Sequence, residues 1–313
     1  MTAAPENAAA SAREVTGSET ARLMRRATYA SMATALFLIA AKAAAYVLTD
    51  AVSMLSTLLD SLLDAAASLV NLLAVRHALT PADREHRFGH GKAEPLAALG
   101  QSAFIAGSAV FLIVQAGSRL VSPQPVANTA IGLAVMAVSI AATLLLVLYQ
   151  RFVIRRTRSL AIRADSLHYA GDLTVNASVV VALVLAGLYG WQRADPILGA
   201  AIAFYIIYTA WQIARGALDM LMDRELPDED RQRIRSIVLA NPQVRAVHDL
   251  RTRASGPTTF VQMHLEVDGQ LTLAAAHDIA DAVEAEILRV FPGAEVIIHQ
   301  DPAGLAEARR AYP

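Results

Sequence analysis

The sequence predicts a mainly α-helical membrane protein, with six transmembrane helices followed by a small domain of order αββαβ. Three observations support this fold class. Hydrophobic residues make up 55% of the 313 residues and charged residues only 18%, and the mean hydropathy is +0.40. Six apolar runs reach the length of about 20 helical residues that a bilayer core requires. After Asp223, charged residues return and the apolar residues become periodic.

The N-terminal part of the chain divides into a tail and a membrane domain. Residues 1–20 are rich in Ala, Ser, Thr and Glu and lack apolar periodicity, so we expect a disordered tail. The transmembrane domain is expected over residues 21–223. Its predicted spans are approximately 28–48, 52–76, 94–121, 127–151, 162–189 and 195–222. Arginines before the first run resemble the start of a signal peptide, but the five later runs favour an integral span.

The distribution of arginine predicts the orientation in the membrane. Positive charge concentrates in the tail, in the 76–92 loop and in the 151–163 loop. The alternate connections, near 49–50, 122–128 and 191–196, carry almost none beyond Arg193. Because loops rich in Lys and Arg remain on the cytoplasmic side, we expect both termini to be cytoplasmic.

Residues 224–302 are expected to form a soluble domain. Pro227 and Asp228 are typical of a helix N-terminus. Two β-like runs follow, 244–253 and 258–267, and then a helix over about 272–291 and a last strand, 294–300. A domain of this size has a marginal core, so a partner subunit would stabilise it. Residues 303–313 are expected to be a tail.

The strongest chemical signal is a set of acidic residues and one histidine within the spans. Asp60 and Asp64 are four residues apart in the second span, and His168 and Asp172 have the same spacing in the fifth. This spacing places each pair on one helical face. A carboxylate deep in a span costs roughly 2.5–3.5 kcal/mol, so such residues default to functional sites. The alternatives are a protonated or ion-paired structural group, or a second span that does not lie in the membrane.

These four residues suit a divalent metal ion. There are no cysteines, which excludes thiolate sites and disulfides. Three carboxylates and one imidazole favour Zn²⁺ in tetrahedral geometry, with Fe²⁺, Cd²⁺, Co²⁺ or Mn²⁺ as alternatives. Ligands of this kind must lose protons before they coordinate, so metal and protons compete for the site.

Two further clusters of ligand-type residues lie outside the spans. Asp83, His86 and His90 are spaced closely enough to converge on a metal if their loop turns, although a solvated loop without a metal fits the spacing equally well. The soluble domain holds a third group, whose convergence depends on tertiary folding: His248, His264, His277, His299 and Asp301.

Several classes of function are excluded by composition and motifs. The net charge of −1 gives no basic field for nucleic acid. The sequence contains no HExxH, CxxC, GxSxG or GxxxxGK[ST] motif, so a zincin, a redox enzyme, a serine hydrolase and an ATP-driven pump each lack their chemistry, and we expect no enzyme. The energy for net transport must then come from ion gradients.

At these residues the sequence resembles the cation diffusion facilitator family, close to its bacterial zinc and ferrous-iron efflux members. The motifs are DSLLD at 60–64, FGHGKAE at 88–94, HYAGD at 168–172, LMDRELPD at 221–228, HDLRTRASGPT at 248–258 and IIHQDP at 297–302. The resemblance implies a homodimer with six spans per subunit and a metallochaperone-like cytoplasmic domain. It also implies a transport site at Asp60, Asp64, His168 and Asp172, a loop site at Asp83, His86 and His90, and a binuclear site at His248, His264, His277, His299 and Asp301. A charge interlock of Lys92 with Asp223 is implied as well.

We therefore expect a divalent metal/proton antiporter in the lipid bilayer of the bacterial cytoplasmic (inner) membrane. Zn²⁺ is the leading substrate, protons are the counter-ion, and regulatory zinc is expected in the C-terminal domain. Two alternatives stay open: a metal-gated channel lined by the same ligands, and a membrane-anchored metal sensor. Lys42, one of only two lysines, has no assigned role beyond snorkelling or helix pairing.

Overall fold

The computed structural model describes residues 4–49, 52–121, 130–189, 191 and 193–304. The chain forms two compact units, one covering Arg22–Leu218 and the other containing the C-terminal domain from Asp219 onward. The boundary lies close to the change of character predicted at Asp223. The predicted outward connection at 122–128 lies outside the described residues. Most of the predicted tail at 303–313 lies outside them as well.

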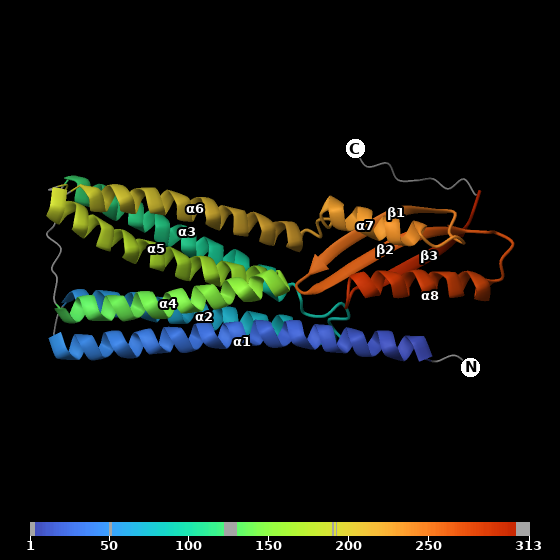
Figure 1. The fold of residues 1–313 in the computed structure, drawn as a ribbon, viewed down its shortest axis with the longest axis horizontal. Coiled ribbons are helices and arrows are strands. Elements are labelled where there is room, and N and C mark those ends of the chain that lie inside the picture. The colour runs from blue at the N-terminus through green and yellow to red at the C-terminus, as the bar shows by residue number, and fades with distance from the viewer. Residues whose placement is uncertain (1–3, 50–51, 122–129, 190, 192, 305–313) are drawn as a thin grey trace. The chain divides into compact units, whose positions relative to one another are not determined.

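The first unit is a bundle of long helices that run side by side (Figure 1). Each overlaps one predicted span. The helices are α1 (Ala4–Thr49), α2 (Val52–Ala78), α3 (Ala93–Val121), α4 (Ala130–Thr157), α5 (Leu160–Tyr189) and α6 (Ala194–Leu221). Within the described residues, α1, α2, α3, α4 and α6 are long and apolar enough to cross a membrane. Helix α5 is not among these five, although it has 30 residues and packs against α2, α3 and α4.

The N-terminus differs from the prediction. The disordered tail expected over residues 1–20 is instead helical from Ala4, and it is continuous with α1. The segment is rich in alanine, which has the highest helix propensity of all residues. The helix therefore follows from alanine propensity and does not require apolar periodicity.

Small residues allow close packing within the bundle, as is usual for membrane helices. Ala109 of α3 belongs to the same buried cluster as Ala203 and Ala210 of α6. Gly171 precedes Asp172 on α5, and a Cβ atom there would lie 3.3 Å from Cδ1 of Ile206 on α6. The glycine therefore lets α6 approach α5 closely at the turn that carries Asp172.

The C-terminal domain has the predicted order αββαβ. Its elements are α7 (Asp228–Leu239), β1 (Ala246–Ser255), β2 (Thr258–Val267), α8 (Leu273–Val290) and β3 (Glu295–Pro302). The sheet order is β1-β2-β3, with β1 antiparallel and β3 parallel to β2. The crossover from β2 to β3 runs through α8, as a parallel connection requires. Figure 1 shows α7 and α8 with the three strands.

Alternation along the strands divides the sheet into two faces. Val261, Met263 and Leu265 of β2 belong to the buried core, together with Ile234 of α7 and Ile279 of α8. The intervening residues of β2, which include the predicted ligand His264, therefore lie on the opposite face. The strand register aligns His264 with His248 on β1 and with His299 on β3.

Candidate metal sites

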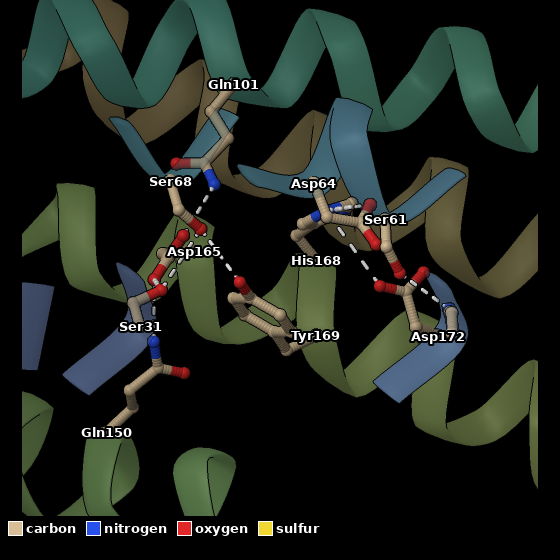
Figure 2. Close-up of polar contacts among 11 residues, drawn as sticks. Ser31, Ser61, Asp64, Ser68, Gln101, Gln150, Asp165, His168, Tyr169 and Asp172 are labelled. Atoms are coloured by element: carbon tan, nitrogen blue, oxygen red, sulfur yellow. Dashed lines mark hydrogen bonds and ion pairs between the residues drawn. The ribbon is translucent and has the colours of Figure 1, made fainter. Parts of the chain in front are cut away.

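The bundle brings together three of the four residues predicted to form the transport site. The transport cluster consists of Asp64 on α2 and of His168 and Asp172 on α5, whose ligand atoms all lie within 4.8 Å of one another. Nε2 of His168 is 3.0 Å from Oδ1 of Asp64 and 3.9 Å from Oδ2 of Asp172. Figure 2 shows both carboxylates close to the imidazole, with dashed lines from the ring to each. Two helices far apart in sequence thus present one set of ligands.

Asp60 lies outside this compact cluster. It is one turn before Asp64 on α2 and is exposed. The next residue, Ser61, is buried, and its Oγ accepts a hydrogen bond of 2.6 Å from Nζ of Lys42 on α1. The interaction gives Lys42 a helix-pairing contact, one of the two uses considered for it. It also places an ammonium group beside the turn of α2 that carries Asp60.

A buried carboxylate that the sequence analysis did not single out, Asp165, lies one turn before His168 on α5. Its side chain accepts hydrogen bonds from Oγ of Ser31 on α1 at 2.6 Å, from Nε2 of Gln150 on α4 at 2.7 Å and from Nε2 of Gln101 on α3 at 3.2 Å (Figure 2). Asp165 is 1% exposed. Three donors can stabilise a buried carboxylate, and here each comes from a different helix.

The same network extends to α2 through hydroxyl groups. Ser31 has one proton and donates it to Asp165, so its 3.2 Å contact with Oγ of Ser68 must be one in which Ser68 donates. Ser68 in turn accepts from the hydroxyl of Tyr169 at 2.8 Å. Tyr169 follows His168 directly. The polar network therefore ties the turn of α5 that carries His168 to α1, α2, α3 and α4.

A second buried carboxylate supports the N-terminus of α5. Glu94 on α3 is 1% exposed, and its Oε1 accepts a hydrogen bond of 3.3 Å from the backbone N–H of Ala161. Oγ of Ser159 accepts from the backbone N–H of Ile162 at 3.2 Å. The first N–H groups of a helix lack partners within it, and a negative charge there is favourable. Glu94 is part of the FGHGKAE motif, and this contact gives it a structural role.

The predicted loop residues also converge. Asp83, His86 and His90 form the loop cluster, in which each residue offers a ligand atom within 4.8 Å of the others. Asp83 is 3.3 Å from Nδ1 of His86 and 3.4 Å from Nε2 of His90. Backbone N–H groups of His86 and Glu85 donate to Oδ1 of Asp83 at 2.6 and 2.9 Å. These hydrogen bonds, above all the one from His86, lower the pKa of Asp83, so its carboxylate is held ready to bind a cation.

In the C-terminal domain, four of the five predicted ligands converge on the open face of the sheet. Oδ2 of Asp301 is 2.8 Å from Nδ1 of His264 and 3.5 Å from Nε2 of His248, while its Oδ1 is 3.2 Å from Nε2 of His299. Asp301 can thus face imidazoles on all three strands. Glu266, which the sequence analysis did not single out, lies 3.5 Å from Nε2 of His248. Alternation from His264 along β2 is the signal that could have identified it.

His277 does not join this group. It lies on α8 with its side chain 67% exposed, and its Nε2 is 3.5 Å from Asp281 one turn later. Helix α8 covers the core face of the sheet, whereas Asp301 faces the opposite side with His264. Within one chain, His277 therefore has no access to the Asp301 cluster. The predicted pair of Lys92 and Asp223 joins the two units and stays a prediction. Within its own unit, Asp223 accepts from Nη1 of Arg253 at 3.3 Å.

A cavity of about 620 Å³ is lined by residues of α2 and α3. Its lining is mainly apolar and includes Phe104 at one end and His77 at the other. The ring of Phe104 is 6.0 Å from that of His168, and the ring of His77 is 4.6 Å from that of His90. The cavity thus adjoins side chains that contact both the transport cluster and the loop cluster.

Comparison with known proteins covers nearly the whole chain. The family model described as the cation efflux transmembrane domain matches residues 28–222, and that of the cation efflux protein cytoplasmic domain matches residues 226–303. The cation-efflux pump FieF of Klebsiella pneumoniae is 52% identical over 287 residues, which cover 92% of this chain and 95% of the relative. The same pump of Serratia proteamaculans is 50% identical over 290 residues, covering 93% and 96%.

A solved structure resembles the C-terminal domain alone. It is the metal-bound C-terminal domain of the CzcD transporter from Thermotoga maritima, which is 29% identical and covers 25% of this chain and 93% of its own, with a TM-score of 0.25. The family of the chain follows from the two matched domains, from the metal-ligand clusters and from the relatives of matching length. The chain belongs to the cation diffusion facilitator family and is a cation efflux transporter, not an enzyme.

Proposed function

We propose that the protein exports divalent metal ions, Zn²⁺ first and Fe²⁺ or Cd²⁺ as further substrates, in exchange for protons. The observation that carries the proposal is the contact of His168 with Asp64 across α2 and α5, with Asp172 in the same cluster. An imidazole and carboxylates are borderline-hard ligands that suit these ions. The relatives are named cation-efflux pumps, which agrees with export.

Proton exchange follows from the chemistry of the ligands. His168 and the carboxylates must release protons to coordinate a metal ion, and protons on the opposite side of the membrane must displace it. Metal reaches the cluster in an inward-facing state, and rocking of the helices then exposes the cluster outward. Asp60, one turn from Asp64, supplies the fourth ligand in at least one of these states. The cavity between α2 and α3 supports an approach from the side of the loop cluster.

The C-terminal domain serves as a dimerisation and metal-sensing module in this proposal. Both termini lie in the cytoplasm of a bacterial cell, and two chains associate through this domain. The Asp301 cluster has three imidazoles and one carboxylate from three strands, a donor set suited to Zn²⁺. Metal that fills this cluster stabilises the sheet, and His277 adds a ligand only where a partner chain brings it near.

Transport in reconstituted vesicles tests the proposal. The full chain is placed in liposomes, and Zn²⁺ uptake is measured with the lumen held acidic relative to the outside, together with lumenal pH. We expect uptake that collapses when an ionophore removes the pH gradient, and lumenal alkalinisation that follows the metal. Asp64→Ala abolishes both, whereas Asp278→Ala, an exposed change on α8, leaves them intact.

The same measurements separate the rival functions. A metal-gated channel would conduct Zn²⁺ down its own gradient with no dependence on the pH gradient and no proton movement. A membrane-anchored sensor would show no flux in the full chain. Deleting residues 225–313 leaves residual flux in a transporter. Uptake by Asp64→Ala equal to that of the unmodified chain would refute the transport site.

A further inference from the structure

One histidine remains without a role in the sites described above. The sequence has eight histidines, and seven belong to the predicted metal sites. The eighth, His77, lies in the last turn of α2, and its ring centroid is 4.6 Å from that of His90 at an interplanar angle of 62°. The ring centroid of His90 is also 4.5 Å from that of His86. Three imidazoles and Asp83 thus gather at the end of α2.

The geometry of His90 is that of a metal ligand already oriented by its surroundings. Nε2 of His90 is 3.4 Å from Oδ2 of Asp83, within the loop cluster. Nδ1 is 3.4 Å from the backbone carbonyl oxygen of Thr80. Metal-binding histidines usually donate their second ring N–H to a carbonyl or carboxylate, which fixes the tautomer. His90 is buried, so this orientation is held by the fold.

The loop cluster supplies three ligands, whereas a closed Zn²⁺ site has four. The ligand atoms of Asp83, His86 and His90 all lie within 4.8 Å of one another, and the ring nitrogens of His77 are not part of this group. Its side chain is exposed, and rotation about its side-chain torsions between staggered rotamers needs no movement of the helix. No cysteine is available to fill the fourth position.

We propose that His77 is the fourth ligand of the loop cluster, which then binds a Zn²⁺-like divalent cation through three imidazoles and the Asp83 carboxylate. The inference rests on the proposed function in that the loop cluster binds metal at all. Its consequence is mechanical. His77 and Asp64 lie on the same helix, about 20 Å apart at 1.5 Å per residue. A cation in the loop therefore fastens the loop to the helix that carries half of the transport site.

The test uses the full chain with Asp64→Ala and Asp301→Ala, which silence the other two clusters. Co²⁺ is titrated as a probe, because four-coordinate Co²⁺ absorbs visible light far more strongly than six-coordinate Co²⁺, and Zn²⁺ is measured by competition. In this background His77→Phe keeps a ring against His90 and removes the ligand. We expect affinity to fall about tenfold or more, since even loss of an outer-shell partner costs about 10- to 100-fold. The visible absorption should fall as well.

A thiol gives a direct readout at the same position. The native chain has no cysteine, so His77→Cys adds a single thiolate, which suits Zn²⁺ and Co²⁺. We expect a sulfur-to-cobalt charge-transfer band. Arg76→Cys is the matched control, because it adds the same thiol one residue earlier on a different side of α2, and it should show no band.

The outcomes separate this inference from the proposed loop site. If Asp83→Ala weakens Co²⁺ binding while His77→Phe binds within twofold of the background and His77→Cys gives no band, the fourth ligand is wrong and the loop site stands. If Asp83→Ala has no effect, the loop cluster is not a metal site and both assignments fail. The inference is supported if Asp83→Ala and His77→Phe both weaken Co²⁺ binding, and if the charge-transfer band appears in His77→Cys but not in Arg76→Cys.

Discussion

The hydroxyl of Ser31 on α1 donates a hydrogen bond to the Asp165 carboxylate on α5, with the two oxygens 2.6 Å apart. The bond joins residues 134 positions apart in the sequence, and both side chains are buried. Gln101 and Gln150 donate to the same carboxylate from two further helices. Asp165 is therefore a point at which four helices of the bundle are held together, one turn from His168.

We predict that Asp165→Asn destabilises the bundle. The amide keeps the size of the carboxylate but offers an N–H₂ group where the network supplies donors, so at least one buried donor loses its acceptor. Such a loss costs about 1–3 kcal/mol. Thermal unfolding in detergent should show a lower midpoint. Asp281→Asn, an exposed change on α8, is the control, and equal midpoints for the two variants would contradict the role of Asp165.

The ligands of the transport cluster could be predicted from the sequence, whereas their supporting network could not. Spacing of four residues placed His168 and Asp172 on one face of α5, and the cost of buried charge identified them as functional. Asp165 carries the same cost, but it lies two residues after the arginine-rich 151–163 segment, where a solvated carboxylate is unremarkable. Its donors come from α1, α3 and α4, and no local pattern in the sequence relates these residues.

The C-terminal cluster shows a similar division. Alternation predicted the strands, but the pairing of β2 with β3 is set by the packing of α8, which lies between them in sequence. That register aligns His264 with His299 and brings Asp301 to both. His277 shares the residue type but lies on the helix, so residue type, density and the family resemblance grouped it with the others.

We predict unequal effects of the two acidic residues of α2. Asp64→Asn removes a carboxylate in contact with His168, whereas Asp60 lies outside the compact cluster. In a background of Asp83→Ala and Asp301→Ala, the Kd for Zn²⁺ should rise more in Asp64→Asn than in Asp60→Asn, as measured by competition with a zinc-binding dye. Equal losses would mean that Asp60 turns toward the ion on binding, as the sequence alone predicts.

Lys42 should oppose metal binding. Its ammonium group contacts Ser61, next to Asp60, and a divalent cation that enters the transport cluster is repelled by it. We expect Lys42→Gln to lower the Kd for Zn²⁺ roughly two- to fivefold, equivalent to about 0.5–1 kcal/mol for a partly exposed charge interaction. Ser61→Ala removes the hydrogen bond and leaves the charge, so it should not reproduce the gain. A higher Kd in Lys42→Gln would show that the lysine supports the site.

Zinc should stabilise the C-terminal sheet through Asp301. A ligand at 100 times its Kd stabilises the folded state by about 2.7 kcal/mol. Hydrogen exchange of backbone amides in β2 and β3 should therefore slow when Zn²⁺ is added to the full chain. Asp301→Ala should abolish this protection, because Asp301 faces imidazoles on all three strands.

His277→Ala should keep most of that protection, since its side chain points away from the cluster. If His277→Ala loses the zinc-dependent protection as completely as Asp301→Ala does, the histidine must reach the metal from a second chain. Chains held at concentrations below and above dimer formation would then differ in their zinc response, and this comparison would decide where His277 binds.

The hydrogen bond between Lys42 and Ser61 makes the chain unusually easy to interrogate by amine chemistry. Lys42 and Lys92 are its only lysines, so a reagent that acylates side-chain amines has two targets. One of them is engaged by a buried serine on the neighbouring helix. The acylated fraction of Lys42, measured by mass spectrometry relative to that of Lys92, therefore reports how often the contact between α1 and α2 opens during turnover.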